Sequence, residues 1–421
     1  MKKVLIVLFM LVLFTVSSQA DTFQLNISNP QYKPINVGLW GFVKNTPPDI
    51  SKRLLKTLKL DLELSGIFSY DLTQHFSYEA PQRVVSGIAK LDKLDYVIYG
   101  DAERNGKSII VNVMVLDILK NYVILQKTYV ANRYSLDWVA NKIIDTLIGY
   151  ITGAYGPFES KILFAMGNTK TSDIYICDFN GENTVRITNW HTFNILPKWV
   201  GQDSITFLSY RYGKPAIFLY NIFNGNLKKL FSASNLSISA VRYQNYFAIP
   251  FNRYGSVNIY VINQHGRVLR QLTNDPSINV SPSFTPDYSQ MVFVSNRDGS
   301  PQIYIKNISL FSSAQRLTFD GKYNSSPAVS PDGKKIAYIS IQNGTTYLKV
   351  MNIDGSNDTV IMKGDSLDSP SWSYDSRYIA LTGRLGNENV IYIVNTLNKQ
   401  YFIAKKTKLI YNGLSVSSKI E

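Results

Sequence analysis

The stretch SPAVSPDGKKIAYIS, residues 326–340, decides the fold of this chain. It opens on Ser326-Pro327, makes a turn at Pro331-Asp332-Gly333 and continues into the apolar run 336–340. Short apolar runs separated by a Pro- and Gly-containing turn are typical of consecutive antiparallel strands. The stretch therefore predicts two strands of a β-sheet joined by a tight turn.

This pattern recurs through the second half of the sequence with a period of about 43 residues. Each recurrence opens on Pro or Ala: Pro197, Ala240, Pro282, Pro327 and Pro370. A third strand-like run follows inside each unit, six times in all, at residues 173–176, 217–219, 258–261, 302–305, 347–350 and 390–393. Four short strands in a unit of this length are the signature of a β-propeller blade, which buries both faces only between neighbouring blades.

The two ends of the repeat region predict how the ring closes. The first unit, beginning at Phe158, has its second, third and fourth strands but no opening strand. The segment 413–417 falls where a seventh opening strand is due. We therefore expect a six-bladed β-propeller over residues 158–421, closed by the C-terminal strand.

Residues 34–157 predict a separate small α/β domain, so the fold class is α+β with two domains. Strand-like runs lie at residues 35–42, 96–100, 109–116 and 122–130. Apolar residues recur at helical spacing from Ile50 to Leu62, with Gly66 placed to end that helix, and again from Leu136 to Ile151 after Ser135, a candidate N-cap. Gly153, Gly156 and Pro157 break this last pattern and mark the linker.

The first 20 residues read as a secretory signal peptide. Lys2 and Lys3 precede the uncharged apolar run 4–16, and Ser18-Gln19-Ala20 predicts cleavage between Ala20 and Asp21. The run is shorter than the roughly 20 residues that span a bilayer, and no later segment is long and apolar enough to do so. We expect an exported protein with no membrane span after cleavage.

Composition narrows the function classes. The 421 residues carry a net charge of +14, with 15 basic and 13 acidic residues in 21–157 but 27 and 17 in 158–421. Such a charge suggests nucleic acid or an anionic surface as a partner, but export and the absence of a nucleic-acid-binding motif argue against nucleic acid. The charge of the second part instead suggests a docking surface for a protein.

Catalytic motifs are missing from the sequence. One cysteine, Cys177, and three histidines leave little material for a nucleophilic or metal centre. There is no Gly-x-Ser-x-Gly elbow, phosphate loop or dinucleotide fingerprint. Cys177 lies in a predicted strand, where we interpret it as a buried small residue. We expect a protein that is not an enzyme and needs no metal or cofactor.

One rim of the predicted propeller collects a repeated arginine. The turn between the second and third strands reads Arg-x-Gly in four of six units, at Arg211, Arg253, Arg297 and Arg384. These guanidinium groups could form a ring that binds carboxylates of an acidic partner, or each could be a solvated hairpin residue. On the same rim Asn194, Asn279 and Asn324 precede the unit-opening proline by three residues, where satisfying the turn backbone is the favoured role.

Residues 21–33 have the pattern of a short strand ahead of the α/β domain. Phe23, Leu25 and Ile27 alternate with Gln24 and Asn26. Such a strand can complete its own sheet or add its edge to another protein by β-augmentation. Periodicity alone favours an ordinary terminal strand or a frayed tail.

The mature chain as a whole resembles the TolB family, the periplasmic β-propeller proteins of the Tol–Pal envelope system. Four segments carry the resemblance together with the six repeats: PINVG at 34–38, DLELSGIF at 61–68, DYVIYG at 95–100 and ITGAYGPF at 151–158. The repeat motif alone would be weak, since many propellers share it. The N-terminal block in this order makes the resemblance specific.

The resemblance implies a non-catalytic periplasmic interaction protein, expected as a monomer. It implies binding of the peptidoglycan-associated lipoprotein Pal at one propeller mouth and of TolA through residues 21–33, which makes β-augmentation the favoured interpretation of that strand. Other outer-membrane proteins are further candidate partners, and the expected roles are outer-membrane integrity and envelope constriction during cell division. The loops that contact Pal in the family correspond here to residues 236–239 and 279–280, adding Leu236, Ser237, Ser239 and Val280 to the rim candidates. The alternative is an exported propeller hydrolase or small-ligand binder that uses the central channel.

Overall fold

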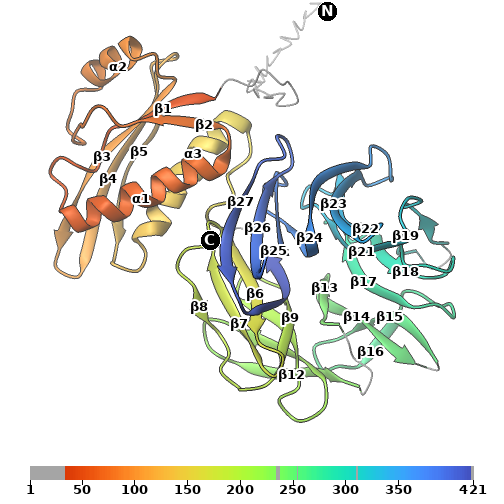
Figure 1. Cartoon of the computed structure of the whole chain (residues 1–421). Helices are drawn as coiled ribbons and strands as arrows, with labels where there is room; N and C mark the ends of the chain where they lie inside the picture. The colour runs from red at the N-terminus through yellow and green to blue at the C-terminus, as the bar shows by residue number, and fades with distance from the viewer. Residues whose placement is uncertain (1–33, 234–237, 254, 310–311, 419–421) are drawn as a thin grey trace, which may run out of the picture.

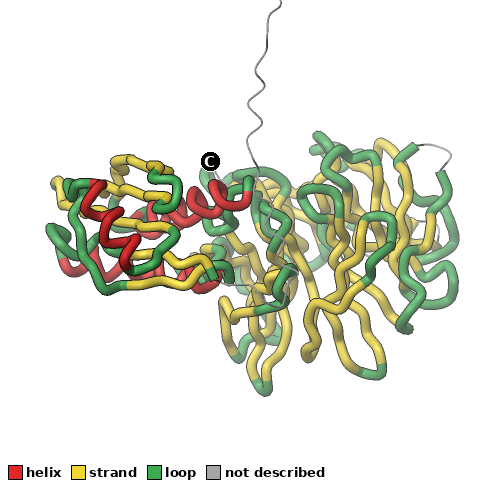
Figure 2. The backbone as a smooth tube through the Cα atoms, turned by 90° about the horizontal axis from the view of Figure 1, so that it is seen from above, coloured by secondary structure: helices red, strands yellow, loops and turns green. Residues whose placement is uncertain are grey.

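The computed structural model describes residues 34–233, 238–253, 255–309 and 312–418. The expected signal peptide with its cleavage site, the strand predicted at 21–33, and the rim candidates Leu236 and Ser237 lie outside the described residues. The chain forms two lobes (Figure 1), and the helices are confined to the N-terminal one (Figure 2).

The N-terminal lobe is a five-stranded sheet with helices on both faces. The strand order is β2-β1-β3-β4-β5; β1 is parallel to β2 and β3, and the other pairs are antiparallel. Helices α1 and α3 cover one face, while α2 packs on the other. The elements are β1 (Ile35–Leu39), α1 (Pro48–Ser65), β2 (Phe68–Asp71), α2 (Gln82–Leu91), β3 (Tyr96–Asn105), β4 (Ser108–Asp117), β5 (Tyr122–Ala131) and α3 (Leu136–Thr152).

The predicted helix ends are correct, but one predicted cap is wrong. Gly66 ends α1 in the left-handed conformation, at φ 66°, which glycine adopts without a steric penalty. Ser135 precedes α3, but its side chain makes no capping bond and instead accepts the backbone N–H of Asn132. The sequence patterns missed β2 and α2, because both are short.

The second lobe consists of antiparallel sheets arranged around a central cavity. Four of them have four strands each: β28-β6-β7-β8, β9–β12, β13–β16 and β17–β20. Their strands are β6 (Lys161–Gly167), β7 (Ser172–Asp178), β8 (Val185–Arg186), β9 (Asn194–Trp199), β10 (Ser204–Ser209), β11 (Ala216–Asn221), β12 (Leu227–Ser232), β13 (Val241–Tyr243), β14 (Tyr246–Arg253), β15 (Ser256–Ile262), β16 (Val268–Gln271), β17 (Asn279–Phe284), β18 (Gln290–Ser295), β19 (Gln302–Asn307), β20 (Gln315–Arg316) and β28 (Ile410–Val416).

The remaining strands form one seven-stranded sheet, so the structure separates four blade-like sheets where the sequence predicted six. The reason is β24 (Thr359–Trp372), which pairs with β23 through residues 359–364 and with β25 through residues 365–372. One strand thus serves two units without an intervening loop. The others are β21 (Tyr323–Val329), β22 (Lys335–Gln342), β23 (Thr345–Asn352), β25 (Tyr378–Leu385), β26 (Glu388–Asn395) and β27 (Tyr401–Thr407).

The predicted pairing of the C-terminal segment with the first unit is present. Strand β28 lies antiparallel to β6, from Ile410 opposite Gly167 to Val416 opposite Ile162. It also contacts the opening strands on both sides. Ser415 Oγ accepts the N–H of Trp199 on β9, and Ser371 Oγ on β24 accepts the N–H of Val416.

A repeated backbone kink marks the opening strands. The residue before the unit-opening proline has a positive φ of 53° in Leu196, Ser281, Ser326 and Ser369, and Gly413 takes this place in β28 with φ 101°. Pairing shifts register at this point in all five strands. The Ser-Pro repeat is therefore the sequence mark of a β-bulge in the opening strand.

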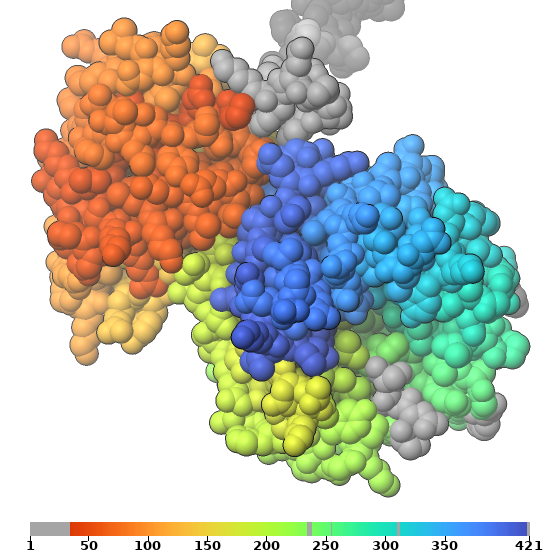
Figure 3. All heavy atoms as spheres, in the orientation of Figure 1, coloured from red at the N-terminus to blue at the C-terminus, as the bar shows by residue number. Residues whose placement is uncertain are grey.

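The two lobes touch each other (Figure 3) and share one apolar core. It includes Leu62 and Ile148 from the helices and Phe179 and Tyr378 from the second lobe. The Tyr378 hydroxyl donates to the backbone carbonyl of Ser65 at 2.6 Å. No helix in the described ranges is long and apolar enough to cross a membrane.

Candidate functional site

The predicted rim is built by strand register. Asn279 at the start of β17 lies opposite Ser295 at the end of β18, which in turn lies opposite Gln302 at the start of β19. The turn that contains Arg297 is therefore level with the start of the opening strand. The same register holds around Asn194 and Ser209, which precedes Arg211. In these two units the asparagine and the arginine-containing turn thus lie at the same edge of the sheet.

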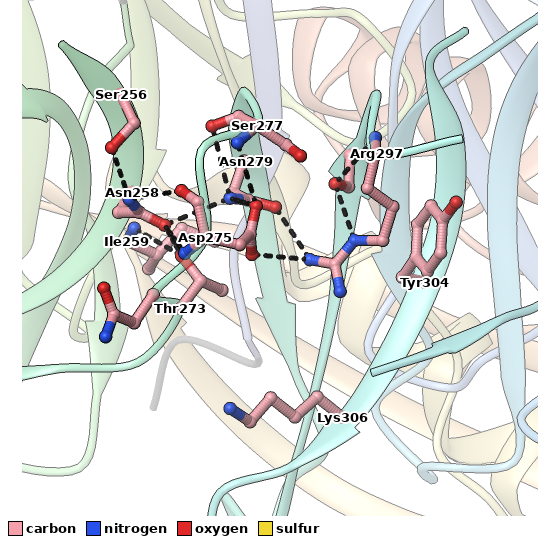
Figure 4. A network of polar contacts seen from close by, with 12 residues as sticks. Ser256, Asn258, Ile259, Thr273, Asp275, Ser277, Asn279, Arg297, Tyr304 and Lys306 are labelled. Carbon is pink, nitrogen blue, oxygen red and sulfur yellow. Dashed lines mark hydrogen bonds and ion pairs between the residues drawn. The ribbon is translucent and has the colours of Figure 1, made fainter. Parts of the chain in front are cut away.

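The three rim asparagines belong to a repeated hydrogen-bonded group that we call the clasp. Each clasp joins a residue near the start of a third strand, a threonine after the fourth strand and the asparagine of the next opening strand. In the clasp of Figure 4, Asn258 Oδ1 accepts from Thr273 Oγ1 at 2.8 Å and from Asn279 Nδ2 at 3.1 Å, while Thr273 Oγ1 accepts the N–H of Ile259. The other two clasps are Asp173–Thr188–Asn194 and Gln302–Thr318–Asn324.

The clasp corrects the prediction that these asparagines face a partner. Asn194, Asn279 and Asn324 are fully buried, with 0% of each residue exposed. Their amides hold neighbouring sheets together, which agrees with the favoured interpretation that they satisfy turn backbone and not with their inclusion in the partner-facing rim. Ser239 is buried as well and donates to Thr206 Oγ1.

Arg297 is also part of the internal network. Its guanidinium donates to Asp275 and to Asn279 Oδ1, both at 3.0 Å, and lies over the ring of Tyr304 (Figure 4). Burial opposes ionisation of Asp275, but hydrogen bonds from Asn279 and Ser277 and the charge of Arg297 outweigh it and hold the pKa of Asp275 below its usual range. Val280, next to this network, is half-buried.

The other three arginines are exposed at the rim. Arg211 stacks over Trp190 at 4.4 Å and extends beside Tyr212. Arg384 donates to the backbone carbonyl of Gly386 at 2.9 Å, and Arg253 is exposed at the end of β14. Exposed arginine and aromatic side chains are enriched at the energetic centres of protein interfaces. The ring of four predicted guanidinium groups is thus reduced to three that a partner can reach.

The opening strands surround a central cavity of about 430 Å³ that is partly open to solvent. Its wall is mostly small or apolar, with Pro282, Pro327 and Pro370 from three opening strands. Three charged residues line it: Lys198 from β9, Arg242 from β13 and Asp368 from β24. At the position of Lys198 the other opening strands carry uncharged residues, namely Val241, Ser283, Ala328, Ser371 and Ser415.

Neither Lys198 nor Asp368 is among the site residues predicted from the sequence. A lysine at a repeat position that is uncharged in every other unit is the signal that could have found this pair. Burial lowers the pKa of the Lys198 ammonium below its usual range, and the charge of Asp368 opposes this shift. The arrangement places an amine and a carboxylate in one cavity.

Two further expectations concern reactive groups. Cys177 is buried in β7, as predicted, and burial raises the pKa of its thiol to about 12, so the thiolate form is strongly disfavoured. In the part of the chain that the structure describes, no three His, Cys, Asp or Glu side chains are grouped so that they could hold a metal ion.

The fold places this chain among the β-propeller proteins, with an N-terminal α/β region added to the propeller sheets. The family model described as the TolB beta propeller domain matches residues 149–406. The chain belongs to this TolB β-propeller family.

Individual relatives agree with this assignment. The chain is 28% identical over 258 residues to the Protein TolB homolog of Chlorobium chlorochromatii, and that match covers 60% of this chain and 58% of the relative. It is 30% identical to the Tol-Pal system protein TolB of Desulfosudis oleivorans, with 65% of each chain covered. These matches therefore span less than two thirds of the relatives' length. The crystal structure of TolB from Acinetobacter baumannii superposes with a TM-score of 0.81 at 21% identity, covering 92% of this chain and 97% of that one, which establishes the similarity of fold.

Proposed function

We propose that this chain is a non-catalytic periplasmic interaction protein of the Tol–Pal system. In this proposal the propeller rim binds a Pal-like lipoprotein and residues 21–33 bind TolA, which couples the outer membrane to an inner-membrane machine and supports its integrity and its constriction during cell division. The observation that carries the proposal is the family match over residues 149–406. The exposed arginines at one rim support it, because they offer donors to carboxylates of an acidic partner.

The proposal also includes the finer architecture. We take the seven-stranded sheet as two blades that share β24, which makes six blades with the four separate sheets. The bonds of β28 to β6, β9 and β24 support a ring closed by the C-terminal strand. The domains are then residues 34–157 and 158–421, and the mature protein is a monomer.

Capture of partners tests the proposal. The immobilised mature chain, 21–421, is expected to retain the soluble domain of the Pal-like lipoprotein and the periplasmic domain of TolA, whereas a chain that begins at residue 34 should retain only the lipoprotein. Charge reversal in the double variant Arg211→Glu/Arg384→Glu should weaken lipoprotein binding roughly tenfold at low salt and less at high salt, because screening removes the contribution of rim charges.

The matched control is Arg267→Glu, which changes an exposed arginine in the turn between β15 and β16 at the opposite edge of its sheet. It should bind like the unmodified chain. Failure of the unmodified chain to retain either partner would contradict the proposal and favour the exported hydrolase or small-ligand binder. Equal weakening by Arg267→Glu would show that the effect is general charge and not the rim.

A further inference from the structure

Two of the three charged residues that line the central cavity, Lys198 and Asp368, have opposite charges and form no ion pair with each other. The third, Arg242, donates to the backbone carbonyls of Val200 and Gln244. Among the described residues, the Lys198 ammonium makes one hydrogen bond, a long one of 3.4 Å to the backbone carbonyl of Leu414, and takes part in no ion pair. An ammonium has three donors. Two donors of Lys198 are therefore available to a molecule inside the cavity.

Asp368 has complementary capacity. One of its oxygens accepts the hydroxyl of Ser326 at 2.8 Å, and the other takes part in no described hydrogen bond. Strand β28, which bonds to both β9 and β24, lies between Lys198 and Asp368. The two groups therefore come from the strands on either side of β28, and the described residues include no ion pair between them.

The rest of the wall suits a small organic ligand. Trp199 and Trp372 offer aromatic surface, and Ser281 and Ser369 offer hydroxyl groups. A volume of about 430 Å³ lies within the range of roughly 300–1,000 Å³ usual for small-molecule sites. Sites of this kind combine an apolar wall with a few placed polar groups that fix the orientation of the ligand.

We propose that the central cavity binds a zwitterionic small molecule, namely a short peptide, whose carboxylate contacts Lys198 and whose ammonium contacts Asp368. A ligand with both charges pairs with both groups at once, whereas a ligand with a single charge pairs with only one of them. This inference does not depend on which protein docks at the rim.

Calorimetric titration of the full mature chain with trialanine tests the proposal. We expect measurable binding by trialanine, and binding weaker by at least roughly tenfold by trialanine amide, which lacks the carboxylate, and by N-acetyl-trialanine, which lacks the ammonium. This comparison needs no variant. Absence of trialanine binding at concentrations on the order of 10 mM, or equal binding of all three compounds, would overturn the proposal.

Two substitutions assign the charges to residues. Lys198→Met should abolish the preference for trialanine over its amide, and Asp368→Asn the preference over its acetylated form. The control Lys229→Met, on the exposed face of β12, should keep both preferences. If Lys198→Met keeps both preferences and loses only lipoprotein capture, the cavity receives a loop of the protein partner and the peptide proposal is wrong.

Discussion

At the scale of single residues, several polar side chains that recur in the repeat bond neighbouring sheets together and do not face a partner. Asn279 is repeated in position because each clasp needs an amide that donates across two sheets. Arg297 has the same sequence context as Arg211, yet only Arg297 has an aspartate, Asp275, within reach. The Arg-x-Gly motif alone therefore could not predict that Arg297 is held in an internal network while the other arginines of the motif are exposed.

The carboxyl group of Asp61 shows how strongly burial can raise a pKa. It lies on α1 at the contact between the lobes and is fully buried; one oxygen accepts from Asn180 at 2.9 Å, and the other has no donor among the described residues. Burial raises the pKa of Asp61 well above its usual range; the bond from Asn180 opposes this, and the charges of Asp145, Asp178 and Asp137 add to it.

This burial predicts a pH dependence of stability. Because the folded pKa of Asp61 is raised, the folded chain keeps a proton on Asp61 over a pH range in which the unfolded chain, with an ordinary pKa of about 3.9, has lost it. Unfolding then releases a proton, so the contribution of Asp61 to stability is present below that pKa and is lost as pH rises towards the folded pKa. Asp61→Asn should make the fall in melting temperature from pH 5 to pH 8 shallower.

The slope should not disappear, because Asp145 acts in the same direction, with a pKa that burial raises to about 8. Asp92→Asn, at an exposed site after α2, is the control and should leave the slope unchanged. An unchanged slope in Asp61→Asn would show that Asp61 is ionised in the folded chain.

At the scale of elements, the connection between the fourth strand and the next opening strand decides whether sheets separate. Thr318 and Asn324 lie six positions apart and hold a loop between them through the clasp. Lys363 and Leu367 stand at the equivalent places, only four positions apart and without such side chains. The chain therefore stays extended, and β24 runs through both units.

The kink in β28 gives a prediction for this element. Gly413 has φ 101°, and a Cβ added there would lie 2.8 Å from Leu196 Cα on β9. Gly413→Ala should lower the free energy of unfolding by about 1–3 kcal/mol, because it adds a close contact to a strained backbone. Denaturant titration measures this loss.

Gly386→Ala is the matched control, because Gly386 also has a positive φ, of 59°, but open space around it. It should cost less than Gly413→Ala. Equal costs would mean that backbone conformation alone matters and that β28 does not pack closely against β9.

At the scale of the whole molecule, the shared core predicts that both lobes unfold together. Tyr378 contributes to this core and bonds to the end of α1 through its hydroxyl. Hydrogen exchange should show one common loss of protection in α1 and β25. Tyr378→Ala removes a buried aromatic side chain, at a cost of about 3–5 kcal/mol, and should allow α1 to exchange first.

Separate unfolding of the two lobes in the unmodified chain would contradict this prediction. Tyr246→Ala is the control, because Tyr246 is an exposed tyrosine in the second lobe. It should leave the common loss of protection intact.

The sequence by itself determined the repeat, the antiparallel strands within each unit, the helix ends at Gly66 and Gly153, and the pairing of the last strand with the first unit. These follow from local periodicity, turn chemistry and the number of strands, all of which are written along the chain. Only the tertiary structure decided which rim residues are exposed, that β24 joins two units, and that Lys198 and Asp368 enter one cavity. The physical reason is that exposure and strand pairing depend on contacts between residues far apart in sequence. A repeat predicts that equivalent residues occupy equivalent positions, but it does not predict which residues of other units contact them.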